Sequence, residues 1–240
     1  MAAGAAGSVA PVLAACDEVV AGLLARTPRT VVLIGSGRHT RRWASQDIAS
    51  LAGFGTDPGS GTPVRTVEAG TPERESSGTT LQLEPPARLP LSLAIGRWLL
   101  ERAGCRADLV LQEVAVESPA EACRRLGVQL AGDTGPDSVW LVLGDGSNRR
   151  GPRSPGHEHP QAAGFDAEVA RAFAAGDPAA LLALDVELAT VLGAAGRGVW
   201  QALAGAVAAA PGWPSIDAAV LYDDAPFGVE YLVAAWQPRS

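Results

Sequence analysis

The chain has 240 residues, enough for one sizeable α/β domain or at most two small ones. Its content of 47% hydrophobic and 19% charged residues is typical of an ordinary globular protein and excludes a disordered one. The net charge of −7 argues against a nucleic-acid partner, because phosphate binding needs a basic surface, and the absence of lysine excludes a Schiff-base mechanism.

Cysteine usage and hydropathy bear on the cellular compartment. Cys16, Cys105 and Cys123 are too few and too scattered for a disulfide framework or a zinc knuckle, so we interpret them as small core residues in a reducing environment. No apolar run approaches the roughly 20 residues that span a bilayer. Residues 1–8 lack the basic segment of a signal peptide. We therefore expect a cytoplasmic protein with no membrane contact.

The first half of the chain predicts two helices around a strand. Apolar residues at helical spacing between Val9 and Leu24 predict the first helix, and Thr30–Ile34 predicts a strand ending at Gly35-Ser36-Gly37. Leu91–Ala103 predicts the second helix, with Gly104 as its stop. Residues 55–88 are rich in Gly, Pro, Ser and Thr, and we expect short strands there because so long a structureless loop is unusual. These strands are expected near Val64–Val67 and Thr79–Leu83.

The second half predicts further alternation of strands and helices. Ser118 and Glu121 form a capping-box pattern that opens a helix to about Leu130. The other expected elements are strands at Leu109–Val116, Val139–Leu143, Ala218–Tyr222 and Val229–Trp236 and helices at about 161–175, 178–193 and 197–209. This alternation predicts a single α/β domain over residues 1–240, with a central, mostly parallel or mixed sheet and helices on both faces.

The turn after Val139–Leu143 is the most informative segment. It reads Gly144-Asp145-Gly146-Ser147-Asn148, and Arg149 follows. Small residues let the backbone bend sharply here, and ligands of open α/β sheets bind beyond the carboxyl ends of strands. We therefore expect a cleft at this point. Asp145 is either a turn-forming residue or a base, because Asp next to Gly commonly satisfies its own backbone.

Three other polar groups are candidates. His39 follows the first strand closely, so it is a solvated loop residue beside Arg38, a pocket residue or a metal ligand. His157-Glu158-His159 contains two histidines that could ligate a metal ion, but it lies in a Pro/Gly-rich loop, which favours a surface position. Asp223-Asp224 indicates a solvated turn or a carboxylate that faces the cleft.

Three segments together resemble the class III extradiol ring-cleavage dioxygenases (LigB-like) and the related Memo proteins. They are Val31 to His39, Leu89-Pro90-Leu91-Ser92-Leu93, and the turn at Gly144 to Asn148, which is similar to the family's Gly-Asp-x-Ser-His motif. The resemblance covers about residues 9–236. It implies a LigB/Memo-like α/β fold and, in active members, Fe(II) held by two histidines and one carboxylate.

Compared motif by motif, the chain departs from this family. The Pro-His motif of the first strand has no counterpart, since the sequence begins at the following helix, and Glu84-Pro85-Pro86 stands where the family has Asp-His-Gly. The catalytic histidine is replaced by Asn148, whose amide does not titrate. The late metal ligand falls near Ala195-Gly196-Arg197, so His39 is the one family ligand retained.

Two hypotheses follow. The first is a degenerate family member without cofactor or ring-cleavage activity, which binds a small molecule or a protein partner in the residual cleft and could form a homodimer. The second is an Fe(II)-dependent extradiol dioxygenase whose first strand was lost to a misassigned start. The candidate site residues are Asn148 and Asp145 at the catalytic position, Gly35, Ser36, Ser147 and Arg149 in the cleft, and His39 as a metal ligand.

Overall fold

A strand that is buried except at its two ends lies at the centre of the fold. The computed structural model describes residues 3–44, 47, 88–210 and 216–239. Strand β1 (Thr30–Gly37) pairs in parallel with β3 (Asp108–Ala115) on one side and with β4 (Ser138–Leu143) on the other. A short strand, β2 (Arg41–Trp43), pairs antiparallel with β3, which gives a mixed sheet of order β2-β3-β1-β4. The β-branched run of β1 suits a strand that is covered on both faces.

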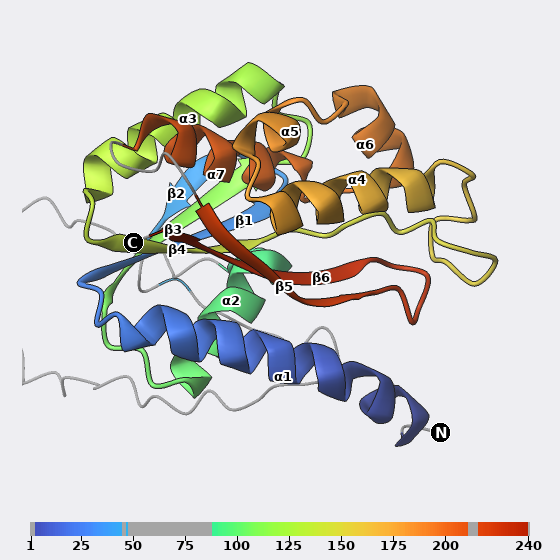
Figure 1. Ribbon diagram of the computed structural model, residues 1–240, viewed down its shortest axis with the longest axis horizontal. Helices are drawn as coiled ribbons and strands as arrows, with labels where there is room; N and C mark the ends of the chain where they lie inside the picture. Colours follow the sequence, from blue (N-terminus) through green and yellow to red (C-terminus); the bar gives the residue numbers. More distant parts are fainter. Residues whose placement is uncertain (1–2, 45–46, 48–87, 211–215, 240) are drawn as a thin grey trace, which may run out of the picture.

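Helices cover both faces of this sheet, as predicted (Figure 1). Helices α1 (Ala3–Ala25) and α2 (Leu91–Arg102) lie on one face. The other face carries α3 (Ala120–Thr134), α4 (Ala162–Ala175), α5 (Pro178–Leu182), α6 (Val186–Leu192) and α7 (Arg197–Ala209). The α/β class and the mixed sheet are therefore confirmed.

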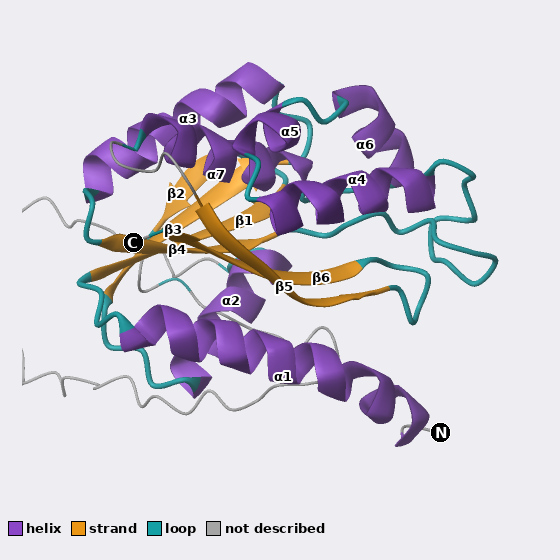
Figure 2. Ribbon diagram, in the orientation of Figure 1, coloured by secondary structure: helices purple, strands orange, loops and turns teal. Residues whose placement is uncertain are grey.

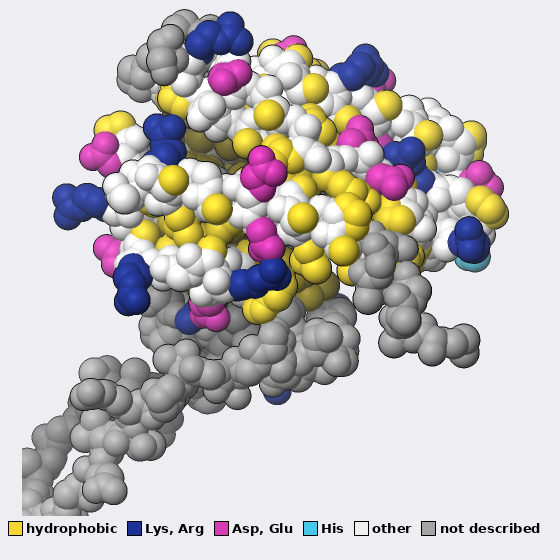
Figure 3. All heavy atoms as spheres, turned by 60° about the horizontal axis from the view of Figure 1, so that its bottom comes forward, with side chains coloured by type: hydrophobic (Ala, Val, Ile, Leu, Met, Phe, Trp, Pro, Cys, Tyr) yellow, Lys and Arg dark blue, Asp and Glu magenta, His cyan; other side chains and the backbone are white. Residues whose placement is uncertain are grey.

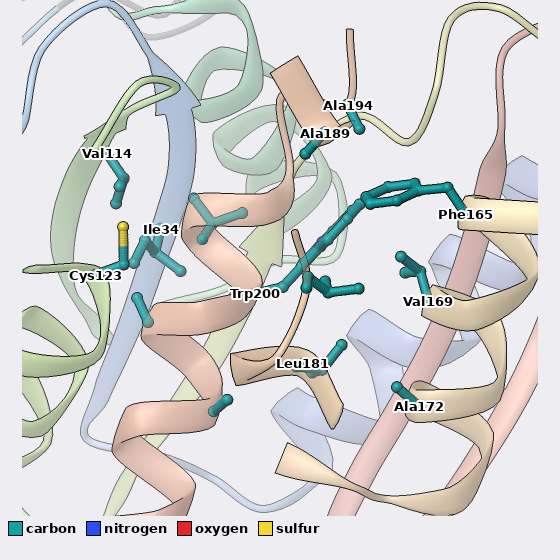
Figure 4. Packing of buried hydrophobic residues seen from close by; sticks show 14 of the residues in the cluster. Ile34, Val114, Cys123, Phe165, Val169, Ala172, Leu181, Ala189, Ala194 and Trp200 are labelled. Carbon is teal, nitrogen blue, oxygen red and sulfur yellow. The ribbon is translucent and has the colours of Figure 1, made fainter. Parts of the chain in front are cut away.

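The two faces of the sheet enclose two separate apolar cores. Because side chains alternate along a strand, Leu33 and Ile34 of β1 point into different cores. Leu33 packs with residues of α1 and α2 such as Val20 and Leu93. Ile34 belongs to the larger core, in which Trp200 of α7 projects toward the α4 side chains (Figure 4).

A separate antiparallel hairpin completes the fold. It consists of β5 (Ile216–Asp224) and β6 (Tyr231–Pro238), which pair with each other and form their own two-stranded sheet (Figure 2). The Trp236 indole donates a hydrogen bond of 2.7 Å to the carbonyl of Phe173, and the two rings lie 5.5 Å apart. The two strands are thus confirmed, but they lie beside α4 instead of extending the main sheet.

Local capping explains where the helix predictions differ from the structure. The single helix expected at 178–193 is two helices, because Asp177 caps α5 and Asp185 caps α6 through a 2.9 Å bond to the Leu188 amide. The predicted capping box is wrong. Helix α3 begins after Pro119 without a side-chain cap, and Glu121 pairs with Arg124 instead.

Two further observations concern the surface and the expected elements. On the face shown in Figure 3, basic and acidic side chains are interspersed with apolar ones. Among the helices of the described ranges, none combines the length and apolar character needed to cross a bilayer. The strands expected near residues 64–67 and 79–83 lie outside the described residues.

Candidate functional site

The turn after β4 is packed tightly against the start of α7. A side chain at Gly144 would overlap the backbone of Gly196, so only glycine fits there. The Gly196 amide donates a 2.8 Å hydrogen bond to the carbonyl of Asp145. Asp145 is an exposed residue, but the protein around its carboxyl raises its pKa by desolvation. This turn therefore has a fixed conformation at the carboxyl end of the sheet.

Ser147 and Asp166 form a buried anchor between the turn and α4. Asp166 accepts a 2.9 Å hydrogen bond from the Ser147 amide and a second bond from the Ser147 hydroxyl. Both residues are inaccessible, at 0% and 2% exposure. Burial raises the pKa of Asp166, whereas the hydrogen bonds from Ser147 and the charge of Arg150 lower it by a smaller amount. Ser147 was expected to line the cleft, and its role in the structure is to hold the turn.

Arg150 connects this anchor to the hairpin. Its guanidinium binds Glu230 and lies 3.9 Å from Asp166, and its amide donates to the Gly228 carbonyl at 3.0 Å. Glu230 is 8% exposed, and its Oε1 is buried without a hydrogen-bond partner among the described residues. Burial and the neighbouring Asp223 carboxyl raise the pKa of Glu230 to about 8, outweighing the opposite effect of Arg150. This shift favours the protonated form of Glu230 over the ionised one.

Asn148 does not point into an open cleft. Its amide N–H binds the Leu192 carbonyl at 3.2 Å, and its side chain occupies the space that Gly156 and Gly193 leave free. A Cβ atom at Gly193 would lie 2.6 Å from the Asn148 Oδ1. That oxygen is buried and has no hydrogen-bond partner among the described residues. The side chain at the family's catalytic position is thus packed between loops.

Gly35 and Ser36 are also interior residues. Both belong to β1 and are buried, and the Ser92 hydroxyl donates a 2.6 Å bond to the Ser36 carbonyl. A side chain at Gly35 would collide with Ser92 and Leu93. These two residues, expected to line the cleft, instead let α2 approach the central strand.

His39 lies two residues beyond the end of β1. Its imidazole is exposed, and its amide donates a 3.0 Å bond to Glu113 of β3. Glu113 is buried and also accepts bonds from Trp43 (2.9 Å) and Arg41 (3.2 Å). Burial alone would raise the pKa of Glu113, but these hydrogen bonds together lower it. His39 is thus bonded to β3, whereas the Asn148 amide is bonded to Leu192.

Among the described residues, two cavities lie near the carboxyl end of the sheet. The first, called here the Arg149 cavity, has a volume of about 370 Å³, within the range of small-molecule sites. It lies between the loop after β4, the start of α4 and the hairpin turn, and is lined by Arg149, Arg150, Gly151, Glu158, His159, Pro160, Ala162, Ala163, Asp224 and Ala225. The second, of about 350 Å³, follows β1 and β3 and is lined by Gly37, Arg38, Ala115, Val116 and Glu117. The expected pocket of His39, Asp145, Ser147 and Asn148 corresponds to neither cavity.

Several of the remaining candidates meet in the Arg149 cavity. Glu158 and His159 line it, whereas His157 is exposed and has a left-handed backbone with φ of 61°. Asp224 lines it from the hairpin, with one carboxylate oxygen accepting the Ala225 amide at 2.7 Å. Of the cleft residues expected from the sequence, Arg149 is the one that lines this cavity.

The described residues do not fit the iron site that the resemblance implies. His39 is exposed, and the carboxylate beside it, Glu113, is already engaged by hydrogen bonds from Trp43 and Arg41. Asn148 is packed between glycines. Within the described ranges, no group of three or more His, Cys, Asp or Glu side chains is placed to hold a metal ion.

Arg197 is a further buried residue that the motif comparison did not single out as functional. It is 1% exposed and donates 2.7 Å hydrogen bonds to the carbonyls of Ser118 and Val116, and a 3.0 Å bond to Gln201. These hydrogen bonds give the buried guanidinium donors acceptors inside the protein. Arg197 therefore fixes the start of α7 to the loop after β3.

Comparisons with known proteins find similarity at the level of solved structures. No protein-family model and no curated protein matches the chain. Among solved structures, the chain is similar to JW3007, an uncharacterized protein from Escherichia coli K12. The identity is 17% over 92% of this chain and 91% of that chain, with a TM-score of 0.45. The resemblance to the extradiol dioxygenases therefore stays a prediction.

Proposed function

We propose that this protein is a degenerate LigB-like domain that binds a small molecule in the Arg149 cavity and lacks ring-cleavage activity. The observation that carries the proposal is Arg149, which is half-buried, lines the cavity and forms no ion pair with a described residue. A guanidinium carries five N–H donors in one plane, so a ligand acceptor in the cavity would gain a charged hydrogen-bonding partner there.

The position of the cavity supports the same proposal. It follows the carboxyl end of β4, where ligands of α/β proteins bind. The Ser147–Asp166 anchor and the Arg150–Glu230 pair hold its walls in place. A binding site whose walls are fixed before the ligand arrives loses less entropy on binding.

Blocking the cavity tests the binding function. Ala163 is exposed in the first turn of α4 and lines the cavity, so Ala163→Trp should fill it without disturbing the core. We expect compounds found by a ligand-observed NMR screen of small metabolites to bind this variant at least about tenfold more weakly, a change of about 1.4 kcal/mol. Ala174→Trp, on an exposed position at the far end of the same helix, is the matched control. An absence of ligands, or equal binding by the Ala163→Trp variant, would contradict the proposal.

Oxygen consumption tests the absence of ring cleavage. With catechol, protocatechuate or 2-aminophenol and added Fe(II), we expect no detectable uptake, because the amide of Asn148 neither takes up nor releases a proton near neutral pH. Asn148→His should not restore activity, since the described residues around it do not provide the remaining ligands. Ferrous-dependent turnover by the unmodified chain would favour the dioxygenase hypothesis instead.

A further inference from the structure

Arg149 is a cation of the cavity wall that lacks a protein partner among the described residues. Its neighbour Arg150 is bound to Glu230 and lies beside Asp166, whereas Arg149 makes no ion pair with a described residue. Its Nε is buried and unbonded, and its carbonyl already accepts the His159 amide at 3.1 Å. The position therefore offers a guanidinium for a planar anionic group such as a carboxylate.

The start of α4 adds a favourable helix dipole to the same cavity. Ala162 and Ala163, in its first turn, line the cavity, and Gln161 provides no side-chain cap. The Gln161 and Ala162 amides already donate to His159, to Nδ1 at 3.3 Å and to the carbonyl at 3.0 Å. An anion next to Arg149 would therefore lie at the positive end of the helix dipole.

Two carboxylates line the same cavity. Glu158 makes no hydrogen bond or ion pair with a described residue, and Asp224 uses one oxygen for the Ala225 amide. These negative charges in the same cavity disfavour a doubly charged phosphate. They also supply acceptors for a cationic group of the ligand. The cavity thus presents both a guanidinium and carboxylates to a ligand.

We propose that the ligand is a small zwitterion of the α-amino acid type. Its carboxylate binds Arg149 and the first turn of α4, and its ammonium binds Glu158 and Asp224. The volume of about 370 Å³ suits one such molecule better than a nucleotide or a peptide. This assignment rests on the proposed binding function and narrows it to one class of compound.

Calorimetry with matched compounds tests the assignment on the full chain. The probes are the free L-α-amino acids, their N-acetyl derivatives, the corresponding amines, and inorganic phosphate. We expect at least one free amino acid to bind, and its N-acetyl and amine analogues to bind at least about tenfold more weakly, because each lacks one charged contact. Phosphate should compete poorly.

Variants of the cavity wall identify the contacts. Arg149→Gln should weaken binding of the amino acid at least about tenfold, and Arg153→Gln, an exposed arginine of the same loop, should leave it unchanged. Asp224→Asn should reduce the preference for the free amino acid over its N-acetyl form. Circular dichroism checks folding, and Arg149→Lys, which keeps the charge but loses the planar fork, should bind with intermediate affinity.

The possible outcomes separate this inference from the proposed function. Equal binding of free and N-acetyl amino acids, tighter binding of phosphate, or unchanged affinity of the Arg149→Gln variant would overturn the zwitterion assignment. If the metabolite screen still finds ligands that Ala163→Trp excludes, small-molecule binding stands and only the ligand class is wrong. If the screen finds none, both proposals fail.

Discussion

Replacing Gly127 with alanine is expected to destabilise the protein by about 1–3 kcal/mol or more, the usual effect of adding volume to a filled core. Gly127 is buried in α3, where an added Cβ would overlap the carbonyl oxygen of Ala202 in α7. The contact is reciprocal, because a Cβ at Gly205 of α7 would overlap the backbone of Arg124 in α3. Backbone on both sides cannot move aside as a flexible side chain would.

The same helix provides the control for this prediction. Gly132 of α3 has nothing within 4 Å of an added Cβ, so Gly132→Ala should raise stability by up to about 1 kcal/mol through helix propensity. Urea denaturation of both variants measures the two effects under identical conditions. If the two substitutions shift the midpoint equally, close packing of α3 on α7 does not limit the residue at position 127.

The main strands could be predicted because their signals are local. In β1, an unbroken apolar run between polar ends is sufficient to indicate a buried strand. Strand β2 could not be predicted in this way, since it has three residues and two of them, Arg41 and Arg42, are exposed. Its position depends on Glu113, about 70 residues away, which accepts bonds from Arg41 and Trp43. Such pairing is not visible in a local sequence window.

The candidate site was only partly accessible to sequence reasoning for the same reason. The turn at 144–148 was located correctly at the end of β4, and Arg149 does line a cavity. Ser147, however, is buried by its bonds to Asp166, 19 positions further along the chain. Glu230 was missed altogether, because its significance comes from Arg150, 80 positions away. A charged residue at the start of an otherwise apolar strand, as in Glu230-Tyr231-Leu232-Val233, was the available signal.

The raised pKa of Glu230 predicts that the protein loses stability as the pH rises. The ordinary pKa is 4.5 and the folded value is about 8, so the folded state holds this proton more tightly than the unfolded state. The stabilisation is complete below pH 4.5 and is lost as the pH rises through 8. One pKa unit corresponds to about 1.36 kcal/mol, which makes the total on the order of 5 kcal/mol.

Glu230→Gln isolates this contribution, because glutamine resembles the protonated acid at every pH. Unfolding by urea from about pH 5 to about pH 9 should show the variant close to the wild type at low pH and more stable than it at the alkaline end. Glu168→Gln, an exposed position on α4, should follow the wild type throughout. The groups around Glu230 come from the loop after β4 (Arg150), α4 (Asp166) and β5 (Asp223), and they are unchanged in the variant. The contrary result is a Glu230→Gln variant that loses stability with pH as steeply as the wild type. In that case the charge of Arg150 lowers the pKa of Glu230 by more than burial raises it, and Glu230 is ionised in the folded protein at neutral pH.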